Sequence, residues 1–294
     1  MKYVIYTADD FSEKKKNSYM GSGKTWYDYG RRMLYSYASR INVPIINVTF
    51  EHKLFKKYFE LYKEIVPLTV RNKIDNYPFP VKHYMLKMMR EYLFLESDYD
   101  YAFFCDLDYI LTDHDVNIKD LVEEDWLYFN AYNHVGDNRL VDLKDMIVTD
   151  VGREIWSKKE NAWCAGFENR YNFMQHLGVK KEYLDLIAPT TGFHCYGKQT
   201  GHQLIEFYNE HQINPMTEDG LKNISDIGFP LNFDEEFLTW AINIGNFKFK
   251  YANSAGLVDE KYFHNENPCV FWHGPQFFNH NVGPKNKQTE WMYR

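Results

Sequence analysis

The sequence has few cysteines, and no two of them lie close together. The four are Cys105, Cys164, Cys195 and Cys269 in a chain of 294 residues. Spacing this wide excludes a dense disulfide framework, and it also lacks the C-x-x-C pairs of a zinc site. We therefore expect free, buried thiols in a reducing compartment.

Long apolar runs are missing as well. No stretch approaches the roughly 20 apolar residues that a membrane helix needs. The apolar start, residues 3–7, is soon followed by Asp9 and Asp10, so it is too short for a signal peptide. We expect a soluble protein of the cytoplasm, either bacterial or, for a viral protein, that of the host.

Positive charge is not in excess. The chain has 34 Lys and Arg against 41 Asp and Glu, a net charge of −7, whereas a protein that coats nucleic acid is more often basic. Aromatic residues make up 18% of the chain. They are explained either by an AT-rich genome or by stacking platforms for sugars or bases. Trp163, Trp272 and Trp291 are the candidates for sugar platforms.

Short apolar runs alternate with helical periodicity in the first part of the chain. Strands are expected at 3–7, 43–50 and 101–105, and helices at 26–40, 51–65 and 81–95. This alternation predicts a doubly wound α/β sheet, in which ligands bind at the carboxyl ends of the strands.

The second half is less regular. The pattern predicts a turn leading into a strand at 189–196, helices at 201–211 and 234–244, strands at 247–251 and 269–272, and a loop at 215–230. The polar stretch 133–165 carries no clear pattern. No repeat or linker divides the chain, which favours a single domain.

Two carboxylates, Asp106 and Asp108, directly follow the apolar run 101–105. Residues two apart on an extended backbone point to the same side, where like charges repel unless a cation lies between them. Hard oxygen ligands suit Mg²⁺ or Mn²⁺, which then bridges to substrate phosphates. Acidic pairs also arise by chance or cap strands, but the apolar residues on both sides favour a metal site.

The segment from Tyr99 through Asp106-Leu107-Asp108 resembles the GT-A class of glycosyltransferases, which use nucleotide-diphosphate sugars. Residues 35–48 are similar to the second βα unit of those enzymes, and 270–274 resemble the C-terminal strand whose His completes their metal site. The resemblance covers most of the chain. It implies a GT-A-like, doubly wound Rossmann-type mixed sheet with an acceptor-side elaboration.

The resemblance also implies a division of labour within one domain, 1–294. Residues 1–113 would bind the nucleotide sugar and residues 114–268 would form the acceptor side. Residues 269–294 would supply the metal-ligand strand and a C-terminal lid.

The implied metal ligands are Asp106, Asp108 and His273. A His ligand favours Mn²⁺ over Mg²⁺. The metal would stabilise the charge on the departing nucleoside diphosphate. The alternative for His273 is a buried, hydrogen-bonded imidazole.

Donor binding is assigned by the same resemblance to residues at the ends of the strands, on the third helix and in two Gly-containing segments. They are Tyr6, Thr7, Ala8, Asp9, Lys87, Asp106, Leu107, Asp108, Thr191, Gly192 and Gly274. Two assignments have plain alternatives, because Asp9 is equally suited to cap a helix and Lys87 to be a solvated charge. A glycine such as Gly192 lets a sugar approach the backbone.

Asp234 and Glu235 open the helix expected at 234–244. Carboxylates are favoured there as caps and by the helix dipole. In GT-A enzymes a carboxylate at a comparable helix start touches the acceptor or the transferred sugar, so these two are the candidate catalytic residues.

The sequence thus predicts a metal-dependent glycosyltransferase that moves a sugar from a UDP-sugar to a hydroxyl of a glycan, a protein or a modified nucleic acid. A haloacid-dehalogenase-type phosphatase using Asp106 and Asp108 is one alternative, although Ile110 stands where that family needs a hydroxyl. A non-catalytic carbohydrate- or nucleic-acid-binding protein is another, suggested by the basic, aromatic tail 280–294.

The run 21–25 resembles part of a P-loop, but it lacks the glycine that a P-loop has at the position of Ser18, which argues against ATP or GTP hydrolysis.

Overall fold

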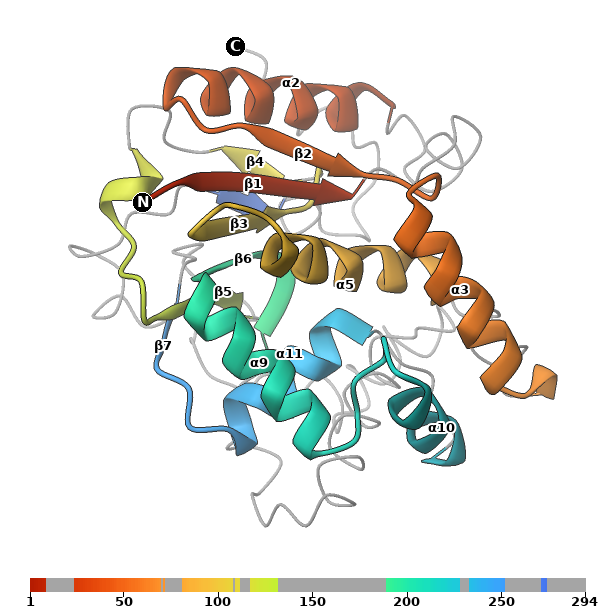
Figure 1. The fold of residues 1–294 in the computed structure, drawn as a ribbon. Coiled ribbons are helices and arrows are strands. Elements are labelled where there is room, and N and C mark those ends of the chain that lie inside the picture. The colour runs from red at the N-terminus through yellow and green to blue at the C-terminus, as the bar shows by residue number, and fades with distance from the viewer. Residues whose placement is uncertain are drawn as a thin grey trace, which may run out of the picture.

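The core of the molecule is a six-stranded mixed sheet in the order β2-β1-β3-β6-β5-β7 (Figure 1). The computed structural model describes residues 1–8, 24–69, 71, 81–107, 109–111, 117–131, 189–227, 233–251 and 271–273. The strands of this sheet are β1 (Tyr3–Ala8), β2 (Ile45–Val48), β3 (Tyr101–Cys105), β5 (Leu127–Ala131), β6 (Pro189–Gly197) and β7 (Phe249–Tyr251).

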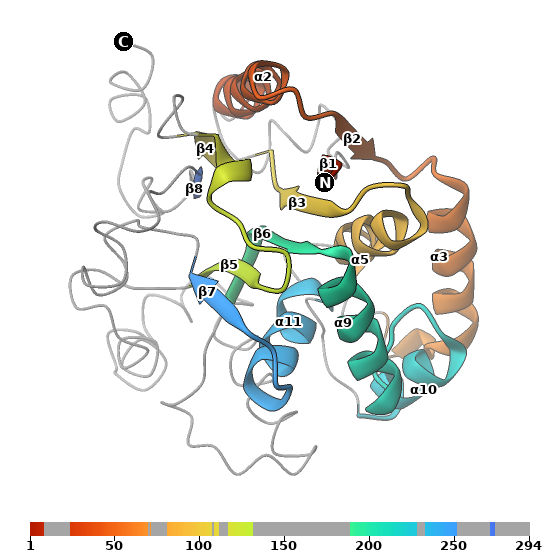
Figure 2. The ribbon, with the colours of Figure 1, turned by 60° about the vertical axis from the view of Figure 1, so that its left-hand side comes forward.

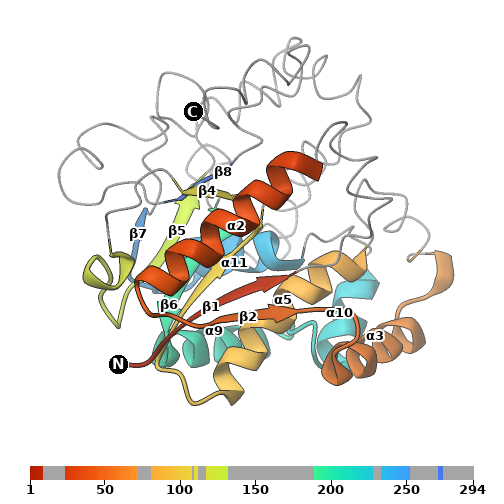
Figure 3. The same ribbon diagram turned by 90° about the horizontal axis from the view of Figure 1, so that it is seen from above.

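The sheet is parallel on one side and antiparallel in the middle. β2, β1 and β3 run parallel to one another, as the connecting helices predict, and Figure 3 shows β1 and β2 running in one direction. β6 lies antiparallel between β3 and β5, and β7 is parallel to β5. The predicted fold class, an α/β Rossmann-type mixed sheet, is therefore confirmed.

Different elements cover the two faces of the sheet (Figure 2). One face carries α2 (Lys24–Arg40), the short helix η1 (Ile118–Asp120) and a two-stranded ribbon of β4 (Tyr109–Leu111) and β8 (Phe271–His273). The other face packs against α5 (Val81–Glu96), α9 (Lys198–Glu210) and α11 (Phe233–Ile244), with α3 (Lys53–Ile65) and α10 (Glu218–Ile227) farther out. We call these the α2 face and the α5 face.

Strand alternation separates the core into two clusters. On β3, Ala102 and Phe104 belong to the cluster on the α5 face, whereas Phe103 and Cys105 belong to the cluster on the α2 face. All five residues of β3 are buried, which fits a central strand covered on both faces. The next residue in this alternation, Asp106, is therefore directed to the α5 face.

One expectation was wrong: the loop predicted at 215–230 contains α10. The hydroxyl of Thr217 accepts a hydrogen bond from the backbone N–H of Gly220 at 3.2 Å, and Glu218 and Asp219 occupy the first turn. These are the marks of a capped helix start, which the Pro and Gly residues around it obscured. β5 was also not predicted.

None of the helices in the described part of the chain is long and apolar enough to cross a membrane.

Candidate functional site

The candidate site is centred on Asp106, where β3 ends. Its backbone N–H donates to the carbonyl oxygen of Gly192 at 2.8 Å, which extends the β3–β6 pairing by one residue. Asp106 and Gly192 were both expected in the donor site, and they are far apart in the sequence. The tertiary structure places them side by side.

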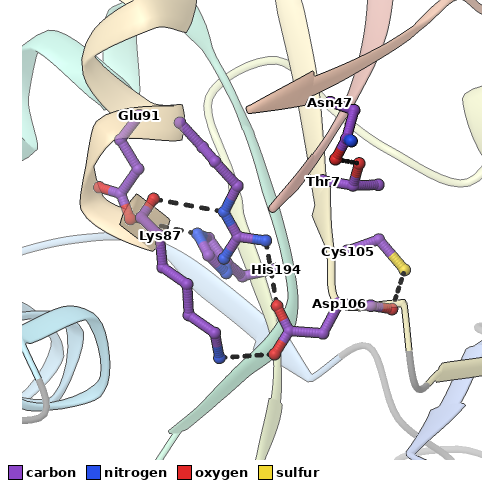
Figure 4. Close-up of polar contacts among 8 residues, drawn as sticks. Thr7, Asn47, Lys87, Glu91, Cys105, Asp106 and His194 are labelled. Atoms are coloured by element: carbon purple, nitrogen blue, oxygen red, sulfur yellow. Dashed lines mark hydrogen bonds and ion pairs between the residues drawn. The ribbon is translucent and has the colours of Figure 1, made fainter. Parts of the chain in front are cut away.

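Two basic side chains from α5 hold the Asp106 carboxylate (Figure 4). Lys87 Nζ lies 2.5 Å from Oδ2, and Arg90 Nη1 donates to Oδ1 at 3.1 Å. Residues three apart on a helix share a face, so both reach the same carboxylate. Two positive charges therefore meet one negative charge at the end of the central strand.

The Arg90 guanidinium is fully buried and makes few hydrogen bonds. Its side chain is 0% exposed, its Nε donates to the carbonyl oxygen of Lys87 at 3.3 Å, and its Nη2 has no hydrogen-bond partner among the described residues. Burying a charge is costly unless it is paired. Asp106 supplies the carboxylate contact of this guanidinium.

A second buried contact joins α5 to β6 beside the first. His194 Nε2 lies 3.3 Å from Glu91 Oε1, and both side chains are buried. The His194 ring stacks on Phe104, with centroids 4.7 Å apart and planes 16° apart. These contacts fix the helix that carries Lys87 and Arg90 against the two central strands.

The α2 face carries a neutral contact at the same edge of the sheet. The Thr7 hydroxyl donates to Asn47 Oδ1 at 2.8 Å, and the two residues are partners in the β1–β2 register. Thr7 is buried and Asn47 is half-buried. The bond orients the Asn47 amide at the carboxyl ends of two parallel strands, where ligands bind in such sheets.

Three expected donor-binding residues lie in or beside the core. Tyr6 is 1% exposed, its ring stacks on Phe104, and it pairs with strands on both sides, so it is part of the core. Leu107 is buried in the cluster on the α2 face. Ala8 is half-buried at the end of β1.

Asp9, Asp108 and Gly274 lie outside the described residues. Only the backbone is described for four other site candidates: Thr191, Asp234, Glu235 and His273. The roles assigned to these residues stay predictions.

The backbone nevertheless places two of these segments. The β4–β8 register pairs His273 with Tyr109, the residue after Asp108. α11, whose first turn contains Asp234 and Glu235, packs against α5 and β6. Within the described residues, no three His, Cys, Asp or Glu side chains gather as metal ligands would.

Arg90 and Asn47 were not predicted as site residues. Arg90 is three residues after Lys87, and that spacing is the signal that could have found it. Asn47 is a polar residue at the end of an apolar strand, which is also a usable signal. Glu91 and His194 carry no comparable sequence signal, because their contact joins residues far apart in the chain.

No protein-family model and no curated protein sequence matches the chain. Among solved structures, the chain is similar to mouse xyloside xylosyltransferase 1 in its apo form, with 11% sequence identity and a TM-score of 0.45. The match covers 97% of this chain and all of that one. At this identity and TM-score, nothing about activity transfers to this chain.

Proposed function

We propose that this protein is a metal-dependent glycosyltransferase that moves a sugar from a nucleotide-diphosphate sugar, a UDP-sugar by preference, to an acceptor hydroxyl. The observation that carries the proposal is Asp106 at the carboxyl end of β3, held by Lys87 and Arg90 beside Gly192. Two cations, Lys87 and Arg90, at the ligand-binding edge of an α/β sheet suit a diphosphate.

The carboxylate of Asp106 fits a divalent cation in its chemistry. It offers hard oxygen atoms, and the present partner of Oδ2 is itself a cation, the Lys87 ammonium. Asp106, Asp108 and His273 would hold Mn²⁺ or Mg²⁺, and the β4–β8 register supports this set because it brings the His273 backbone next to the residue after Asp108. The metal would supply charge neutralisation at the leaving diphosphate.

The other parts of the site have separate tasks in this proposal. Thr7 and Asn47 would orient the nucleoside at the ends of β1 and β2, and Gly192 would let the sugar approach the backbone. Asp234 or Glu235 would accept the proton of the acceptor hydroxyl or face the transferred sugar.

The test is incubation of the full chain with a panel of nucleotide sugars and Mn²⁺, scoring slow release of nucleoside diphosphate without an acceptor. We expect release with one donor and its loss in Asp108→Asn. The variant at Asp108 is preferred to one at Asp106, because Asp106 is the counter-ion of a buried arginine. Circular dichroism and thermal unfolding must match the wild type for the comparison to count.

Asp98→Asn is the matched control, because it removes an exposed carboxylate from the turn before β3. Release should be unchanged in it. Release from no donor, or equal release by Asp108→Asn and the wild type, would overturn the proposal. Hydrolysis of p-nitrophenyl phosphate would support the phosphatase alternative instead.

A further inference from the structure

The two cations that hold Asp106 differ in their freedom to move. Arg90 is 0% exposed and is fixed by bonds from Nε and Nη1. Lys87 is 24% exposed on its side chain, and its flexible stem ends in a compact ammonium. Arg90 is therefore an anchor, whereas Lys87 is able to exchange its partner for water or another anion at low cost.

Because the two cations differ in this way, the two carboxylate oxygens of Asp106 have different roles. Oδ1 accepts from the fixed guanidinium, so the carboxylate keeps its orientation when Lys87 leaves. Oδ2 accepts from Lys87, and Asp106 is 17% exposed. Oδ2 is thus the oxygen that an incoming cation would take.

A divalent cation and the Lys87 ammonium would compete for Oδ2. Like charges at contact distance repel strongly in a partly buried site. The ammonium must therefore move away when the metal binds. In the proposed reaction the donor diphosphate offers the ammonium a new partner of suitable charge, because a phosphate oxygen accepts from lysine readily.

We propose that Lys87 is a displaceable counter-ion of Asp106: it neutralises Oδ2 before ligands bind, yields Oδ2 to the divalent cation, and moves to the donor diphosphate. The inference rests on the proposed function, whose metal and donor it uses. Arg90 acts as the positioning residue that keeps Asp106 in place during the exchange.

This exchange links metal binding to nucleotide binding. Metal alone must displace Lys87 from Oδ2 without supplying a phosphate for its charge, and nucleotide alone must draw Lys87 away from a carboxylate oxygen that no metal neutralises. When both bind, each charge finds a partner. Mn²⁺ and UDP should therefore strengthen each other's binding, by the same factor in both directions, within about 5- to 150-fold.

The test measures binding rather than turnover. Electron paramagnetic resonance of free Mn²⁺ gives the metal affinity, and isothermal titration calorimetry gives the UDP affinity with and without Mn²⁺. In Lys87→Met, Mn²⁺ alone should bind roughly tenfold more tightly, UDP should bind more weakly, and the coupling factor should fall towards one. Lys87→Arg, which keeps the charge, should retain the coupling.

Lys82→Met is the matched control. It removes the same charge from α5, but the Lys82 ammonium lies over the Phe50 ring, 4.8 Å from its centroid, whereas the cations on Asp106 are Lys87 and Arg90. Its Mn²⁺ affinity and coupling should equal those of the wild type. Any general effect of removing one positive charge would appear in this variant too.

The outcomes separate the inference from the function on which it rests. Tight Mn²⁺ and UDP binding by the wild type, with unchanged Mn²⁺ affinity in Lys87→Met, would overturn the displacement and leave the function standing. Unaltered coupling in Lys87→Met would do the same. A wild-type chain that binds neither Mn²⁺ nor UDP would remove the proposed function and the inference with it.

Discussion

The two faces of the central sheet are both well packed, but only one of them buries charge. On the α5 face, Arg90 and Glu91 are buried, and Asp106 and His194 complete their contacts. On the α2 face, the polar contact at the same edge of the sheet is neutral and joins the Thr7 hydroxyl to Asn47. Among the described residues, the buried Asp, Glu, Lys and Arg side chains are those of Arg90 and Glu91.

This difference indicates where the fold accepts an energetic cost. A buried ion pair contributes little to stability compared with apolar packing of the same volume, yet breaking it is strongly destabilising. Breaking a neutral hydrogen bond is less destabilising, because the net contribution of such a bond to stability is small. In α/β sheets, ligands also bind at the carboxyl ends of the strands. The α5 face at the end of β3 is therefore the place to look for chemistry.

The largest effect is expected from Asp106→Asn. The substitution keeps the shape of the side chain but leaves the buried Arg90 guanidinium without its carboxylate. We expect the free energy of unfolding to fall by about 3 kcal/mol, as measured by chemical denaturation. Asp98→Asn, at an exposed carboxylate, should change it by no more than about 0.5 kcal/mol.

A double variant sharpens this prediction. Arg90→Met combined with Asp106→Asn removes both charges, so it should recover much of the loss. An Asp106→Asn variant as stable as the wild type would show that Arg90 does not depend on this carboxylate. The contrast between the two faces would then lose its basis.

The next effect tests the α2 face through pH. Burial raises the pKa of the Cys195 thiol to about 12, from an ordinary value of 9.0. The folded state therefore keeps a proton that the unfolded state loses. The contribution of this protonated thiol to the free energy of unfolding is fully present below about pH 9 and is lost as the pH rises towards 12.

Replacing this thiol should weaken the pH dependence of the free energy of unfolding above about pH 9. Between pH 9 and 12, the free energy of unfolding of Cys195→Ser should fall less steeply than that of the wild type, by at most about 1.4 kcal/mol per pH unit. Urea unfolding at several pH values measures the slope. Identical slopes in the two proteins would contradict a buried, protonated Cys195.

The smallest effect is expected from Thr7→Val, which removes one neutral hydrogen bond from the α2 face while keeping the shape of the side chain. The 2.8 Å bond to Asn47 is lost, but the half-buried amide can turn to water. We expect a loss of about 1 kcal/mol in the free energy of unfolding. Thr7→Ser retains the hydroxyl and is the control. A loss of unfolding free energy in Thr7→Val as large as that in Asp106→Asn would contradict the contrast between the two faces.

Much of the first half of the fold could be predicted from the sequence. Apolar runs and helical periodicity are local signals, and they located β1, β3, α2 and α5 closely. They failed at α10, where the cap at Thr217 was hidden among loop-forming residues, and at β5. The antiparallel insertion of β6 beside β3 also left no local signal, because strand pairing joins distant segments.

The candidate site, like the fold, could be predicted from the sequence only in part. Asp106 was predictable, because an acidic residue after an apolar strand is a local pattern, and Lys87 was selected by its place on the preceding helix. The partners of these residues were not predictable in detail. That Lys87 takes Oδ2 and Arg90 takes Oδ1 depends on how α5 packs across β3.

The sequence by itself determined the alternation of strands and helices, the two faces of β3, and the position of Asp106 at its end. It did so because side-chain direction along a strand or helix repeats with a short, fixed period. Only the tertiary structure decided that Gly192 and the buried pair Glu91–His194 lie beside that carboxylate. Contacts between residues about a hundred positions apart depend on the packing of whole elements, and no short stretch of sequence records that packing.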